Sequence, residues 1–183
     1  MRLIGRWLSH GLGLALALFC GVLAMQAPAF THAYASALLQ VASDARRDID
    51  QREDSARRYY GIAAEDEAGV VVALQAHEPS NAETLAHSIA HASRLGAAYA
   101  RITQSPLLLQ PLTAFADAWN DPEGDKAAIW KLSWQSFTPQ LDLGFAALLY
   151  GFGGLMLGAL AAELVAAVTM KAKRRRLALH GYS

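Results

Sequence analysis

The sequence is poor in the residues and motifs from which most enzyme sites are built. It has one cysteine, Cys20, so no intramolecular disulfide can form. It has no HExxH, GxSxG or P-loop motif. The glycine-rich string YGFGGLMLG has Met156 where a dinucleotide-binding loop needs its third glycine. We therefore expect a protein that is not an enzyme, with no catalytic residue and no cofactor.

Charged side chains are absent from two long apolar stretches near the ends of the chain. No Asp, Glu, Lys or Arg occurs from Trp7 to Met25 or from Leu143 to Ala162. A helix of about 20 apolar residues spans the ~30 Å hydrocarbon core of a bilayer. We predict an all-α protein with two transmembrane helices, residues 7–25 and residues 141–170, the second including an interfacial extension. They flank an antiparallel helical domain, residues 26–140.

The charges segregate along the chain although they cancel overall, with 16 Lys and Arg against 16 Asp and Glu. No Lys or Arg occurs between Arg6 and Arg46, whereas basic residues precede the first span and cluster after the second. Because Lys and Arg beside a span stay on the cytoplasmic side, we expect residues 1–6 and 171–183 to be cytoplasmic and the middle to be translocated. The side chains expected to anchor the spans at the membrane surface are Trp7, Trp130, Trp134, Lys171, Lys173, Arg174, Arg175 and Arg176.

A cleaved signal peptide is the alternative to a first transmembrane helix. Arg2 and Arg6 would form its basic region, residues 12–23 its apolar region, and residues 22–24 a tolerable cleavage context. The apolar run from Trp7 is longer than the ~7–15 residues of a usual signal peptide, which favours a retained anchor.

Small residues recur at helical spacing in both apolar stretches. In each stretch they form a ridge of small side chains along one helix face. The ridge of the first stretch consists of Gly13, Ala17 and Gly21, and that of the second consists of Gly151, Gly154, Gly158 and Ala162. Such ridges let membrane helices approach closely, so the two spans could pack on each other. The alternative is that Gly and Ala are simply common in membrane helices.

One acidic residue, Glu163, interrupts the second apolar stretch before the basic cluster. Twenty residues from Leu143 to Ala162 already rise ~30 Å, which places Glu163 at the inner membrane boundary. A register shifted toward Thr169 would bury it more deeply, where an acid needs a partner in a neighbouring subunit or a role in proton transfer. We favour the interfacial position.

The translocated region shows helical periodicity. An apolar stripe with steps of three and four residues begins at Phe30 and predicts a helix that ends at Gly61. Its charged faces contain four pairs at four-residue spacing, typical of a solvated face with surface ion pairs or of a partner-docking face. These pairs are Arg46 with Asp50, Asp48 with Arg52, Glu53 with Arg57, and Asp54 with Arg58.

Three further elements follow. Ser80 and Glu83 have capping-box spacing, which predicts a helix from about Ser80 to Gln104. Apolar residues after Pro106 predict a shorter helix. Pro111 either kinks this helix or marks its start. Residues 120–125 predict a turn, and a last helix places Trp130, Trp134 and Phe137 on one face as an aromatic membrane belt.

His87 and His91 form the strongest candidate metal site. They are four residues apart and could hold one Zn²⁺ or Cu²⁺ on a helix face, whereas Glu83 lies ~12 Å along the helix from His91. No cysteine in this region could complete the site. A polar helix face with solvated or hydrogen-bonded histidines is the favoured alternative.

Three short strings and the two-span layout resemble a known family. The strings QAPAF after the first span, ARRDID in the first long helix and FTP before the second span are similar to an uncharacterised bacterial membrane protein family, domain of unknown function 2937. The resemblance covers nearly the whole chain. It implies a bacterial inner-membrane protein with a periplasmic helical domain, and it implies no activity and no site residue.

Together these patterns predict a scaffold or accessory subunit of a membrane complex. We expect it to contact membrane lipids, to form a homo-oligomer or part of a larger complex, and not to bind nucleic acid. The two alternatives are a periplasmic metal-binding protein that uses His87 and His91, and an accessory to proton-linked transport that uses Glu163.

Overall fold

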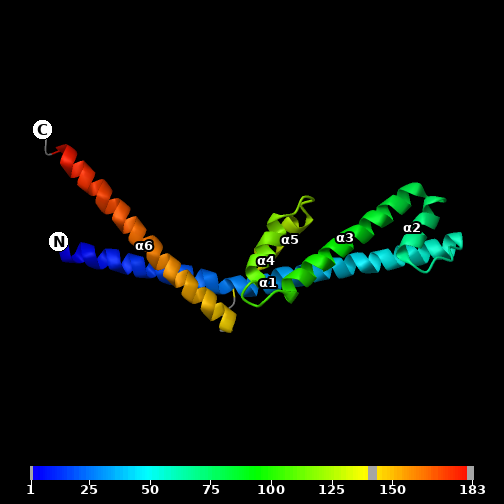
Figure 1. Cartoon of the computed structure of the whole chain (residues 1–183), viewed down its shortest axis with the longest axis horizontal. Coiled ribbons are helices and arrows are strands. Elements are labelled where there is room, and N and C mark those ends of the chain that lie inside the picture. Colours follow the sequence, from blue (N-terminus) through cyan, green and yellow to red (C-terminus); the bar gives the residue numbers. More distant parts are fainter. Residues whose placement is uncertain (1, 140–143, 181–183) are drawn as a thin grey trace. The chain divides into compact units, whose positions relative to one another are not determined.

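The computed structural model describes the backbone of residues 2–139 and 144–180, and the side chains of residues 11–139 and 144–168. In these ranges the chain is all-helical, as predicted, with no strand (Figure 1). The helices are α1 (Arg2–Tyr60), α2 (Glu67–Gln75), α3 (Pro79–Gln104), α4 (Gln110–Trp119), α5 (Asp125–Ser136) and α6 (Phe145–His180). Their contacts divide the chain into two units. We call Met1–Ala29 with Thr138–Ser183 the paired-helix unit and Phe30–Phe137 the helical domain.

The paired-helix unit consists of the first half of α1 and of α6, which crosses it (Figure 1). Among the described residues, Gly11–Tyr60 and Phe145–Val168 are long and apolar enough to cross a membrane, judged by length and composition. The helix α1 continues through Pro28, whose missing N–H removes one backbone hydrogen bond without ending the helix.

The helical domain has two apolar clusters along its length. One joins α1 residues from Phe30 to Ala42 to the C-terminal half of α3, to α4 and to α5. The other joins Ile49 and Ala56 of α1 to α2 and to the N-terminal half of α3. The order of these contacts means that α3 runs back along α1 (Figure 1). The apolar stripe that begins at Phe30 therefore packs within this chain.

Several helix ends agree with the sequence, including the start of α3 to within one residue, and one predicted cap does not. The helix α1 ends before Gly61, whose φ of +65° lies in the left-handed region that favours glycine. The helix α3 ends at Gln104, as predicted. The predicted capping box is wrong, because Glu78 is the N-cap and the helix begins at Pro79. Proline is suited to the first helical position, so it starts the helix before Ser80.

The segment after Gln104 follows the predicted plan. The helix α4 begins at Gln110, with Pro111 in its first turn, so Pro111 marks the start of the helix and does not kink it. The predicted turn is confirmed between α4 and α5, where Gly124 has a φ of +82°. Asp121 caps α5, since its Oδ2 atom accepts hydrogen bonds from the Lys126 and Ala127 N–H groups at 2.7 and 3.1 Å.

An aromatic cluster closes the end of the helical domain where the chain enters and leaves it. The Phe30 ring makes edge-on contacts with Trp130, Trp134 and Phe137, with centroid separations of 4.6, 5.3 and 5.5 Å. Such edge-on pairs contribute about 0.5–1.5 kcal/mol beyond the area that they bury. The three aromatic residues of α5 and its C-terminus thus share a face, as predicted, and that face packs on α1.

Replacing Tyr34 by phenylalanine is expected to stabilise the helical domain. Tyr34 is fully buried, and its hydroxyl has no hydrogen-bond partner among the described residues. A buried polar group without a partner costs about 1–3 kcal/mol, so removing the hydroxyl is expected to raise the free energy of unfolding by about 1 kcal/mol. Denaturant unfolding of the full chain in detergent, followed by tryptophan fluorescence, measures the change.

Tyr59 provides the matched control for this substitution. Its side chain is 87% exposed, so Tyr59→Phe is expected to change the free energy of unfolding by less than about 0.5 kcal/mol. A loss of stability in Tyr34→Phe, with no change in Tyr59→Phe, would mean that the Tyr34 hydroxyl is hydrogen-bonded in solution.

Candidate functional site

The most specific contact in the paired-helix unit is made by small residues of α1 and α6. A Cβ atom added to Gly158 would lie 2.7 Å from the Ala17 Cα atom, and one added to Gly154 would lie 2.6 Å from the Cys20 carbonyl oxygen. One added to Gly21 would lie 3.2 Å from the Gly151 carbonyl oxygen. The two backbones are thus too close for side chains at these positions, which is the packing that small-residue ridges permit.

This contact contains every residue of the two ridges. It extends from Gly13, which faces the Ala162 Cβ atom, to Gly151, which faces the Met25 side chain. Ala17, Gly21, Gly151, Gly154 and Gly158 are all buried. The order of contacts is opposite along the two helices, so α1 and α6 run in opposite directions within the unit. The ridges are therefore occupied by each other within one chain.

The outer surface of the same two helices carries the large apolar side chains. Leu12, Phe19, Phe152 and Leu157 are all more than half exposed, as are many of their apolar neighbours. Burial in this unit is thus inverted relative to a water-soluble helix pair, because small residues lie inside and large apolar residues lie outside. It is the arrangement typical of membrane helices, which close packing rather than side-chain burial holds together.

The remaining membrane candidates occupy different positions. Glu163 is exposed, next to Ala162 at the end of the helix contact. Trp130 packs within the first apolar cluster, and Trp134 keeps 66% of its surface exposed although it contacts Phe30. The side chains of Trp7, Lys171, Lys173, Arg174, Arg175 and Arg176 lie outside the described residues.

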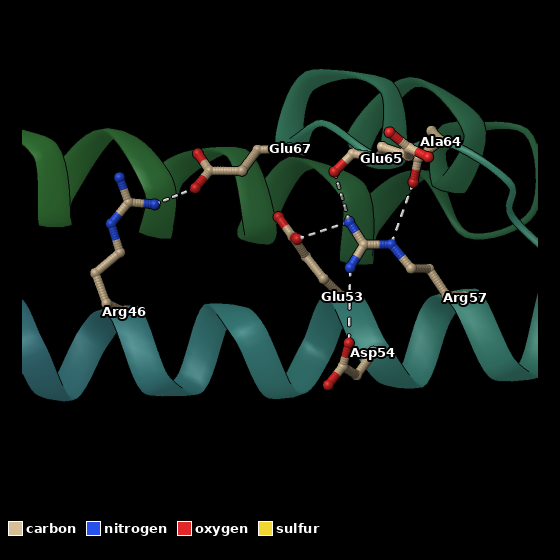
Figure 2. A network of polar contacts seen from close by, with 7 residues as sticks. All are labelled: Arg46, Glu53, Asp54, Arg57, Ala64, Glu65 and Glu67. Carbon is tan, nitrogen blue, oxygen red and sulfur yellow. Dashed lines mark hydrogen bonds and ion pairs between the residues drawn. The ribbon is translucent and has the colours of Figure 1, made fainter.

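A polar network ties the end of α1 to α2 and the loop before it (Figure 2). Arg57 is its centre, because its guanidinium donates to the carbonyl oxygens of Ala64 and Glu65, each at 3.2 Å, and to the Glu53 carboxylate at 3.2 Å. The Asp54 carboxylate lies 3.6 Å away, and Arg46 pairs with Glu67 of α2. The network thus fixes a loop that has no helix of its own.

Glu53 is the buried member of this network. Only 5% of its surface is exposed, and its Oε1 atom has no hydrogen-bond partner among the described residues. Burial raises the pKa of the Glu53 carboxyl, the nearby Glu67 and Asp50 carboxylates raise it further, and Arg57 opposes the shift.

A polar groove of about 370 Å³ lies beside the same end of α1. It includes Tyr60, whose hydroxyl donates to the Glu78 carboxylate and whose ring stacks on His77 at a centroid distance of 4.8 Å. The Asn81 amide also donates to Glu78, at 2.9 Å. These hydrogen bonds lower the pKa of Glu78 and, through that carboxylate, raise the pKa of Tyr60. Arg52 also pairs with Asp48 at 2.8 Å, so each charged side chain that lines the groove bonds to another residue of the lining.

The histidine pair on α3 lies in a set of contacts between helices. The His91 Nδ1 atom is 2.9 Å from the Asp125 Oδ2 atom of α5, and the His87 side chain is exposed. The described residues contain no group of three or more His, Cys, Asp or Glu side chains that could hold a metal ion. Metal binding by His87 and His91 stays a prediction.

Sequence reasoning missed the contacts that cross between elements. Of the four predicted pairs on α1, Asp48 with Arg52 and Glu53 with Arg57 form. Arg46 instead pairs with Glu67, and Arg58 donates to the Asp54 carbonyl oxygen at 3.2 Å. The helix α2 was not predicted at all, because its short apolar run has no helical period.

Comparisons with known proteins identify the family. No curated protein and no solved structure matches the chain. A family model described as a protein of unknown function, DUF2937, matches residues 8–175, which include both candidate membrane spans, Gly11–Tyr60 and Phe145–Val168, and the whole helical domain. The chain therefore belongs to the DUF2937 family.

Proposed function

We propose that this protein is a non-enzymatic scaffold or accessory subunit of a membrane complex in the bacterial inner membrane. The paired-helix unit is its anchor. The observation that carries this proposal is the inverted burial of the first half of α1 and of α6, with glycine and alanine inside and large apolar side chains outside. Two helices that pack in this way in water would expose an apolar surface far larger than soluble proteins tolerate.

The proposed topology places the helical domain in the periplasm and both termini in the cytoplasm. Basic residues before α1's apolar stretch and in residues 171–176 support it, because they flank the spans on the side opposite to the helical domain. The opposite directions of α1 and α6 also support it, since two such helices return the chain to its starting side.

The contacts of the helical domain support a structural rather than a catalytic role. Its least exposed charged groups are engaged in ion pairs, one within α1 and two between helices. Glu53 pairs with Arg57, and Asp117 of α4 pairs with Arg101 of α3 and with Lys126 of α5. Because the ridges of α1 and α6 cover each other, association with a second copy or another subunit uses the remaining surfaces of the chain.

Native mass spectrometry of the full chain, extracted from its own membranes in a mild detergent, tests this role. A stoichiometric second protein would support an accessory subunit, and a homo-oligomer of the intact chain would support a self-assembling scaffold. A monomer without any protein partner, in detergents that preserve other complexes of the same membrane, would contradict both. The same spectra report a bound metal ion if the histidine pair holds one.

The topology is tested by cysteine accessibility in a Cys20→Ala background. We expect Tyr59→Cys, at an 87% exposed site of the helical domain, to react with a membrane-impermeant maleimide in spheroplasts. Ser183→Cys is the matched position in the basic tail and is expected to react only after lysis. The reverse pattern would show that the helical domain is cytoplasmic.

A further inference from the structure

The helix α4 exposes an apolar face that nothing in the described chain covers. Leu112, Phe115 and Trp119 are 61%, 53% and 78% exposed, and their spacing places them on one side of the helix. The opposite side consists of Ala114 and Ala118, which are buried against α1, α3 and α5. The helix therefore turns its small residues inward and its large apolar residues outward. This is the same inversion that the first half of α1 and α6 show.

The exposed face carries no charge. No Asp, Glu, Lys or Arg occurs from Ile102 to Ala116. The one charged residue of α4, Asp117, points into the fold, with 8% of its side chain exposed, toward Arg101 and Lys126. A docking face for a charged peptide or for another polar surface would need complementary charges. A surface of leucine with phenylalanine and tryptophan suits the boundary between lipid headgroups and acyl chains.

The position of α4 in the helical domain also favours lipid. The helix packs in the cluster that contains Phe30. This is the first residue of the helical domain, and it directly follows the paired-helix unit in α1. Trp130 links α4 to Phe30, because its ring centroid lies 4.6 Å from that of Phe30 and 6.0 Å from that of Phe115. Phe137, where the chain leaves the domain, also contacts Phe30. Phe115 thus belongs to the end of the domain at which the chain continues into both apolar helices.

We propose that α4 binds the surface of the bilayer that its own chain crosses, with Leu112, Phe115 and Trp119 inserted at the headgroup boundary. This contact is a third attachment of the chain to the membrane, and it holds the first apolar cluster against the lipid. It involves no basic residue of α4, so it does not require anionic lipid and is insensitive to salt. The proposal rests on the membrane anchoring proposed above.

Site-specific fluorescence in proteoliposomes tests the proposal with the full chain. In a Cys20→Ala background, an environment-sensitive dye is attached to Leu112→Cys or Trp119→Cys on α4. Val72→Cys, at an exposed site of α2, is the aqueous control, and Phe152→Cys on α6 is the lipid reference. We expect quenching by nitroxide-labelled phosphatidylcholine to be at least about threefold stronger at 112 and 119 than at 72, and equal in low and high salt.

Three results would overturn the proposal. The first is equal quenching by iodide in the buffer of the dyes at positions 112, 119 and 72, which would place α4 in water. Quenching of the dye at position 152 by the labelled lipid would then show that the membrane anchor is intact. Dyes shielded from both quenchers would mean that a second copy or another protein covers α4. Absence of lipid quenching at 152 would refute the membrane anchor itself.

Discussion

Replacing Gly154 by leucine is expected to separate α1 from α6. A Cβ atom at this position would lie 2.5 Å from the Ala24 Cβ atom and 2.6 Å from the Cys20 carbonyl oxygen. The oxygen belongs to the backbone and cannot rotate away, so the two helices must move apart. Overpacking of this kind costs about 1–3 kcal/mol, and a separated pair also loses the close packing that holds membrane helices together.

A disulfide between the two helices measures this separation. A Cβ atom at Gly13 would lie 3.4 Å from the Ala162 Cβ atom, near the ~3.5–4.5 Å that disulfide-bonded cysteines require. In a Cys20→Ala chain, Gly13→Cys with Ala162→Cys is therefore expected to oxidise within one chain. Adding Gly154→Leu is expected to lower the oxidised fraction at least about fivefold under mild oxidant.

Gly153 provides the matched control on the neighbouring position of α6. A Cβ atom there would meet no heavy atom within 4 Å. Gly153→Leu is expected to leave the disulfide yield unchanged and to favour the helix by about 1 kcal/mol. Equal yields in the two leucine variants would refute the contact. A disulfide that joins two chains, seen as a dimer on a non-reducing gel, would show that the ridges pair between copies.

The paired-helix contact illustrates what a single sequence can predict. In any α-helix, residues three and four positions apart lie on one face, so the sequence predicts the shared face of Gly151, Gly154 and Gly158. The identity of the facing surface does not, because a ridge can equally meet a ridge of the same chain, a second copy or lipid. The structure selects the first of these by placing Ala17 and Cys20 against Gly158.

The polar contacts of the helical domain were less predictable, for a physical reason. Pairs at four-residue spacing on α1 depend only on helix geometry, and two of the four form. Arg46 and Glu67 are 21 residues apart, and they meet because α2 packs on α1 through its apolar side chains. Likewise, no local pattern indicates that Arg57 binds loop carbonyl oxygens. Such contacts follow from tertiary packing, which periodicity does not report.

Replacing Arg57 by methionine is expected to destabilise the helical domain by about 3 kcal/mol at neutral pH. The substitution removes the ion pair with Glu53 and the hydrogen bonds to the Ala64 and Glu65 carbonyl oxygens. The Glu53 side chain is only 7% exposed, so its carboxylate would stay buried without an opposite charge. We place the loss at the lower end of the range for broken buried pairs because the Arg57 side chain is 30% exposed.

The pH dependence of this loss identifies its cause. Burial raises the pKa of Glu53, so the folded chain keeps this proton to a higher pH than the unfolded chain does. Between the two pKa values the folded state binds more protons, and stability therefore falls as pH rises through the raised pKa. Without Arg57 the pKa of Glu53 rises further. The difference between Arg57→Met and the natural chain is thus expected to be smallest in acid, near the ordinary pKa of glutamate, and to widen toward neutral pH.

Tryptophan fluorescence during denaturant unfolding measures these changes in the full chain, because Trp119, Trp130 and Trp134 lie in the helical domain. The chain with both Glu53→Gln and Arg57→Met is the decisive comparison. With no buried charge left at this site, it is expected to be more stable at neutral pH than Arg57→Met alone. The pH dependence of its stability that comes from Glu53 is expected to disappear. If Arg57→Met loses the same free energy in acid as at neutral pH, then its bonds to the loop carbonyls, and not its pairing with Glu53, hold α2 on α1.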